Sequence, residues 1–182
     1  MPRIWIRVMI IIALLATIAH GRVYSTREEA LLRVFGEDAK VEKVSLYLSR
    51  DEAEEIAKRA KVKDVSRLFT YYRGTKDGRT IAYVTFVSHV VRTKYAVTMV
   101  VLNPDLSIRK VEVVAFYEPE EYIPEGRWFK QFSGKRLTPS LWPRRDIQTV
   151  TGATLSVNTI VRETRKVLAI FERMVQNRKK ER

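Results

Sequence analysis

Residues 41–48 alternate between apolar and polar side chains, which is the pattern of a β-strand that buries one face. Four further stretches also have β-strand character. Short turns such as Asp77-Gly78 and Asn103-Pro104-Asp105 separate them, and turns of this length join antiparallel neighbours. The pattern therefore predicts a twisted, mainly antiparallel sheet, whose other strands are expected at residues 68–72, 80–88, 95–102 and 108–117.

Three segments carry helical signals. Ser25 and Glu28 have the spacing of a capping box and begin a short helix that Gly36 ends, and Ser49 caps a charged helix at residues 50–60. The last helix extends for about twenty residues, with one apolar face at helical spacing. That face is expected to pack on the sheet, so the predicted fold class is α+β. It is marked by Ile160, Val161, Thr164, Val167, Leu168, Phe171, Met174 and Val175.

Residues 118–146 are predicted to be irregular because they contain four prolines and two glycines, with a short helical turn at 127–132. A loop of this length inside a compact domain usually has a function. Aromatic side chains in and beside it are candidates either for a ligand pocket or for the core. They are Tyr117, Tyr122, Trp128, Phe129, Phe132 and Trp142.

The beginning of the chain has the pattern of a targeting segment. Arg3 and Arg7 precede an uncharged apolar run at residues 8–19. A basic start followed by about a dozen apolar residues is typical of a signal peptide or a short membrane anchor. We therefore assign residues 1–25 to that segment and expect an exported protein, in the periplasm or on the outer face of the cytoplasmic membrane. The alternative is a buried N-terminal helix or strand.

The composition excludes some kinds of metal site and favours some kinds of partner. The chain has no cysteine and only two histidines, His20 and His89, which excludes thiolate metal sites and makes a multi-histidine site improbable. His89 is expected to be a structural histidine at the end of a strand. The net charge of +13, or +10 without residues 1–25, favours anionic lipid or acidic proteins as partners. Export argues against nucleic acid. Residues 177–182 form a basic tail.

The sequence Thr151-Gly152-Ala153-Thr154 lies between the irregular segment and the last helix. Two hydroxyls flank two small residues, so backbone amides there can approach a ligand closely. The start of a helix also has unpaired N–H groups and the positive end of the helix dipole, which suit a phosphate. An ordinary turn in which Thr154 or Ser156 is the N-cap is the alternative.

This stretch resembles the signature of the FMN-binding domain family, Asp-x-x-Ser/Thr-Gly-Ala-Thr. The family includes flavin-carrying subunits of sodium-pumping NADH:quinone reductases and of Rnf-type complexes, and small exported flavoproteins. The resemblance implies that a flavin transferase, using FAD, attaches FMN to Thr154 through a phosphoester. Gln148 stands where the motif has aspartate, which leaves both covalent and non-covalent FMN open. The implied phosphate-binding residues are Thr151, Gly152, Ala153, Leu155 and Ser156.

The resemblance extends over residues 41–174, so the FMN-binding domain is placed at residues 26–176. It implies that Lys94, Glu118 and Trp128 lie near the flavin. Thr93-Lys94 stands where the family often has Gly-Lys, and the family's glycine after Glu118 is missing, so the ring pocket is expected to be reshaped.

The implied function is electron transfer between redox donor and acceptor proteins. The resemblance favours an electron carrier or a component of a redox complex over a stand-alone enzyme. Two alternatives remain at this stage. One is a flavin-free domain that kept the fold and binds a membrane surface or a protein. The other is an exported hydrolase with a Ser or Thr nucleophile, for which His89 is the candidate base.

Overall fold

The computed structural model describes the backbone of residues 21–180 and the side chains of residues 21–176. The apolar run at residues 8–19, on which the expected signal peptide or anchor rests, lies outside the described residues. Within the described part, no helix is both long enough and apolar enough to cross a membrane.

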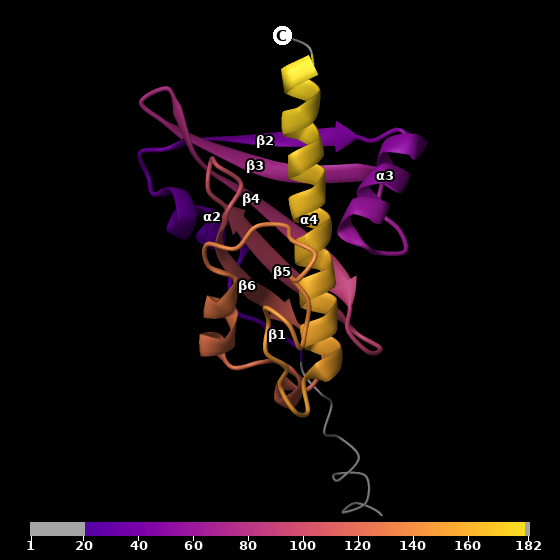
Figure 1. The fold of residues 1–182 in the computed structure, drawn as a ribbon. Coiled ribbons are helices and arrows are strands. Elements are labelled where there is room, and N and C mark those ends of the chain that lie inside the picture. Colours follow the sequence, from indigo (N-terminus) through magenta and orange to yellow (C-terminus); the bar gives the residue numbers. More distant parts are fainter. Residues whose placement is uncertain (1–20, 181–182) are drawn as a thin grey trace, which may run out of the picture.

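Six strands form one antiparallel sheet in the order β1-β6-β5-β4-β3-β2 (Figure 1). Asp77 and Gly78 join β3 to β4 with positive φ angles of 51° and 72°, as an Asp-Gly turn requires. The predicted α+β fold with a mainly antiparallel sheet is therefore confirmed. The strands are β1 (Arg22–Val23), β2 (Lys40–Tyr47), β3 (Leu68–Lys76), β4 (Arg79–Val90), β5 (Tyr95–Leu102) and β6 (Ile108–Phe116).

The larger apolar cluster lies between the sheet and two helices, α3 (Arg50–Ala60) and α4 (Thr154–Lys180). Phe171 of α4 is almost fully buried, and its ring centroid lies 5.2 Å from that of Tyr71 and 5.1 Å from that of Tyr83. This contact confirms that the C-terminal amphipathic helix packs on the sheet.

The opposite face of the sheet carries α2 (Arg27–Phe35) and a smaller apolar cluster. Phe35 packs directly over Gly74 of β3, where a Cβ atom would lie only 2.2 Å from the Phe35 ring. Glycine at this position therefore lets the helix approach the sheet closely.

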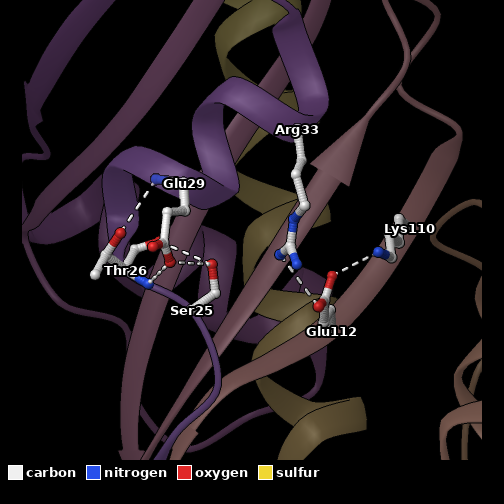
Figure 2. A network of polar contacts seen from close by, with 6 residues as sticks. All are labelled: Ser25, Thr26, Glu29, Arg33, Lys110 and Glu112. Atoms are coloured by element: carbon white, nitrogen blue, oxygen red, sulfur yellow. Dashed lines mark hydrogen bonds and ion pairs between the residues drawn. The ribbon is translucent and has the colours of Figure 1, made fainter.

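The start of α2 differs by one residue from the prediction. Thr26 is the N-cap, and the capping box joins Thr26 to Glu29 instead of Ser25 to Glu28 (Figure 2). Both pairs have the required spacing, so spacing alone could not choose between them. The N–H groups of Tyr24 and Ser25 still donate to the carbonyl of Val114 in β6, which holds the chain on the sheet one residue longer.

Residues 117–153 contain two short 3₁₀ helices, η1 (Glu120–Tyr122) and η2 (Gly126–Phe132), and are otherwise irregular. The buried Arg165 of α4 fixes this segment. Its guanidinium donates to the carbonyls of Thr138 and Leu141, at 2.8 and 3.1 Å, and stacks on Trp142, 4.5 Å from the ring centroid. The predicted loop is therefore a packed segment that contacts β6 through η2 and α4 through Arg165.

Candidate functional site

The turn before α4 leaves amides available at the start of the helix. Gly152 has a φ of +85°, a backbone conformation that favours glycine. The N–H of Val157 donates to Ala153 O at 2.9 Å and begins the helical hydrogen-bond ladder. The amides of residues 154–156 therefore precede the ladder, at the positive end of a 27-residue helix.

A cavity of about 220 Å³ lies at this helix start. Its walls come from three segments that are far apart in the sequence: the β4–β5 turn, η1 and the first turn of α4. The lining residues are Arg92, Tyr122, Gly152, Ala153, Thr154, Leu155 and Ser156. The structure therefore brings together five of the residues that the motif predicted.

Arg92 adds a positive charge to this cavity. Its guanidinium carbon lies 4.6 Å from the centre of the Tyr122 ring, so the aromatic face helps to hold the side chain in place. A guanidinium and helix-start amides together favour an anion with several oxygen acceptors. Sequence reasoning missed Arg92. The signal that could have found it is its position two residues before Lys94, in the turn that the resemblance had already singled out.

The hydroxyls of the motif have different surroundings. The side chain of Thr154 is exposed, and Thr151 is exposed just ahead of the helix. Ser156 is fully buried, and its hydroxyl donates to the carbonyl of Tyr122. Ser156 therefore ties α4 to η1 through its side chain, and Thr154 presents the accessible hydroxyl at this end of the helix.

Glu118 organises the β4–β5 turn that carries Arg92. Its buried carboxylate accepts the N–H groups of Arg92, Thr93 and Lys94 at 3.1, 2.6 and 2.7 Å. Burial by itself raises the pKa of Glu118, but the hydrogen bonds from these three amides outweigh it, and the net pKa is lowered. The Glu118 carboxylate is therefore an internal anchor that positions Arg92. The side chain of Lys94 is exposed at the end of the same turn.

Trp128 and Gln148 support the segment that leads into the motif. The buried Trp128 indole N–H donates to Gln148 O at 2.7 Å, and Gln148 N–H donates to Gln131 Oε1 at 2.8 Å. These bonds fix the backbone of Gln148 to η2 while its side chain is exposed. Neither Trp128 nor Gln148 lines the 220 Å³ cavity.

His89 lies beside a second cavity of about 600 Å³, between the start of β3, the end of β4 and the middle of α4. Its Nε2 is 2.9 Å from Thr98 Oγ1, as expected of a structural histidine, whereas Nδ1 has no hydrogen-bond partner among the described residues. Burial, and after it the charges of Arg162 and Lys166, lower the pKa of His89 to about 4. His89 is therefore neutral at neutral pH. Within the described part of the chain, no group of three or more His, Asp or Glu side chains could hold a metal ion.

Comparison with solved structures gives a likeness in fold. No model of a known protein family and no curated protein sequence matches the chain. Among solved structures, the crystal structure of Shewanella oneidensis NqrC aligns with 80% of this chain and 83% of its own, with 13% identity and a TM-score of 0.45. A likeness at that level carries no argument about ligand or activity.

Proposed function

We propose that this chain is an exported electron-transfer protein that holds FMN by its phosphate at the start of α4. The observation that carries the proposal is one cavity that combines the exposed Thr154, the amides ahead of the helical ladder and the Arg92 guanidinium. A phosphate is stabilised by such donors and by positive charge. The sequence resemblance at residues 151–154 points to the same ligand.

In this proposal each motif residue has a separate role. Thr154 would supply the hydroxyl oxygen that holds the FMN phosphate in a phosphoester, and the transferase would draw FMN from FAD, with AMP as the leaving group and the hydroxyl proton passing to solvent. Gly152 allows the sharp turn that aims the amides, and the buried Ala153 keeps the turn against the fold. Leu155 and Ser156 contribute backbone N–H groups, because the hydroxyl of Ser156 is already bonded to Tyr122.

The residues around the turn would shape the rest of the site. Glu118 fixes the turn that holds Arg92, Lys94 adds a second exposed cation, and Trp128 holds the backbone that precedes the motif. FMN would supply the transfer of one or two electrons, while the protein binds, shields and tunes it. The proposed partners are redox donor and acceptor proteins and a flavin transferase, and an anionic membrane surface is a further candidate.

Replacing the proposed acceptor tests the assignment. Thr154→Val should abolish flavin fluorescence of the denatured protein on a gel, when the chain is produced with its transferase and export route. Thr151→Val is the matched control, since Thr151 is also exposed and lies in the same turn. Mass measurement of protein from the membrane fraction would report both attachment and removal of residues 1–25. Fluorescence that survives in the Thr154 variant would exclude this acceptor.

Gln148 allows a second test, because it replaces the aspartate of the motif. Gln148→Asp should increase labelling if the transferase needs a carboxylate at this exposed position. Protein that binds FMN reversibly, without covalent labelling, would support the non-covalent form of the proposal. A fully processed sample that is colourless and takes up no FMN would support the flavin-free binding domain instead.

A further inference from the structure

A row of exposed apolar side chains lies on the face of the sheet that α2 covers elsewhere, on β1, β4, β5 and the residue that directly follows β6. Val90 of β4 pairs directly with Tyr95 of β5, and the N–H of Tyr117 donates to Tyr95 O at 3.0 Å. On β1, Val23 pairs with Ala115. Val23, Val90, Tyr95 and Tyr117, here called the tyrosine row, are 56%, 44%, 61% and 40% exposed.

The tyrosine row lies where the polypeptide enters the fold. Gly21 packs so closely on Tyr117 that a Cβ atom at this position would lie 2.1 Å from the Tyr117 ring. The apolar run ends at Ala19, only two residues earlier. Two residues span at most about 7 Å, so the medium that receives the apolar run also lies next to this row.

The chemistry of the row suits the boundary between lipid and water. Tyrosine is enriched there because its ring is apolar and its hydroxyl is polar. Lys94 is exposed in the turn between Val90 and Tyr95, where a long cationic side chain can reach lipid phosphates. We propose that the tyrosine row lies against the headgroup region of a bilayer that contains anionic lipid, with residues 8–19 as the adjacent anchor.

The same face of the sheet offers a matched control pair. Tyr47 of β2 pairs directly with Leu68 of β3, and these side chains are 82% and 50% exposed. Tyr47 lies three strands from β5 and Leu68 two, which is about 14 Å and about 10 Å at the usual strand spacing. The accumulated twist of a sheet over two to three strands is about 40–75°. A flat membrane that touches the tyrosine row should therefore leave this pair in water.

Because the chain has no cysteine, single cysteines can report which face meets the membrane. The full chain would carry one fluorophore, introduced through Tyr95→Cys, Tyr117→Cys, Tyr47→Cys or Leu68→Cys. It would be reconstituted in vesicles of phosphatidylglycerol and phosphatidylcholine that contain brominated lipid. We expect at least threefold stronger quenching at 95 and 117 than at 47 and 68. Equal quenching at both pairs, or none at 95, would overturn the proposal.

A second measurement separates lipid from other occupants of the row. A label at Val90→Cys should lose most of its quenching in the double variant Tyr95→Ser/Tyr117→Ser, and should keep it in Tyr47→Ser/Leu68→Ser. Circular dichroism would check that both variants fold. A label at residue 95 that is already shielded without lipid, or that cross-links to a second copy, would show that protein covers the row and would refute the membrane assignment.

Discussion

The starts of α3 and α4 differ in what lies near their unpaired backbone N–H groups. In α3, the Ser49 hydroxyl accepts the N–H of Glu52 at 3.1 Å, and the Glu52 carboxylate accepts the N–H of Ser49 at 2.9 Å. The first turn of α4 contains no acidic residue, and Arg92 lines the cavity in front of it. One helix start is thus neutralised by its own side chains, whereas the other combines open amides with an added cation. The difference supports the proposal that the start of α4 receives an anion from outside the chain.

The largest effect is expected when the support of the α4 site is removed. Glu118→Gln removes the negative charge from the oxygen that accepts three backbone N–H groups and leaves a weaker, neutral acceptor. We expect a loss of about 2 kcal/mol in the free energy of unfolding, measured in urea, because hydrogen bonds to a charged acceptor are the strong ones. Glu120→Gln is the control, since Glu120 is an exposed partner of Arg22 and should cost under about 0.5 kcal/mol. Equal losses in the two variants would contradict the anchoring role of Glu118.

The next effect concerns the cation that distinguishes α4 from α3. Arg92→Gln should weaken FMN binding by the unlabelled protein about tenfold, which is about 1.4 kcal/mol, because one charged contact to phosphate is lost. Quenching of FMN fluorescence on titration measures this affinity. Arg79→Gln is the matched control, because Arg79 is an exposed arginine beside the β3–β4 turn. An unchanged affinity in the Arg92 variant would remove the electrostatic argument for the site.

Local sequence signals predicted the helix starts better than they predicted the site. The Ser49 cap and the bounds of α3 at residues 50–60 follow from the sequence because a cap depends only on neighbouring residues. The cavity at α4 could not be predicted in the same way. Arg92 and Tyr122 reach it through the register of β4 with β5 and through the packing of η1, and neither depends on residues near Thr154 in the sequence.

Other contacts between residues far apart in the sequence could not be predicted either. The motif placed Ser156 near a phosphate, but only the fold reveals that its hydroxyl is bonded to a carbonyl 34 residues away. Likewise, the sequence does not indicate that Arg165, in the middle of an amphipathic helix, is buried against backbone carbonyls of the long loop. Periodicity predicts which face of a helix is buried, but not which loop covers it.

A smaller effect should separate the two helix starts in stability. Ser49→Ala removes a capping acceptor and should cost about 1 kcal/mol, as is usual for a lost N-cap. Thr154→Val, at an exposed position with no hydrogen bond to its hydroxyl among the described residues, should change the free energy of unfolding by less than about 0.5 kcal/mol. Urea unfolding of the protein without flavin would measure both changes in the free energy of unfolding. A cost at Thr154 as large as at Ser49 would identify Thr154 as a structural cap and weaken its assignment as an acceptor.

The smallest expected effect is a difference in pH dependence between the capped start of α2 (Figure 2) and the uncapped start of α4. The backbone N–H of Thr26, and after it the Thr26 hydroxyl, lower the pKa of Glu29 below its ordinary value. Because the folded pKa is the lower one, the capping contribution is complete above the unfolded pKa and is lost as the pH falls through the folded pKa. We therefore expect the protection factors of the amides in the first turn of α2, which are corrected for the intrinsic pH dependence of exchange, to fall in acid. The amides of residues 154–157 should show no such step, because that turn has no carboxylate. Glu29→Gln should abolish the pH dependence in α2, and a step that persists in this variant would show that another group causes it.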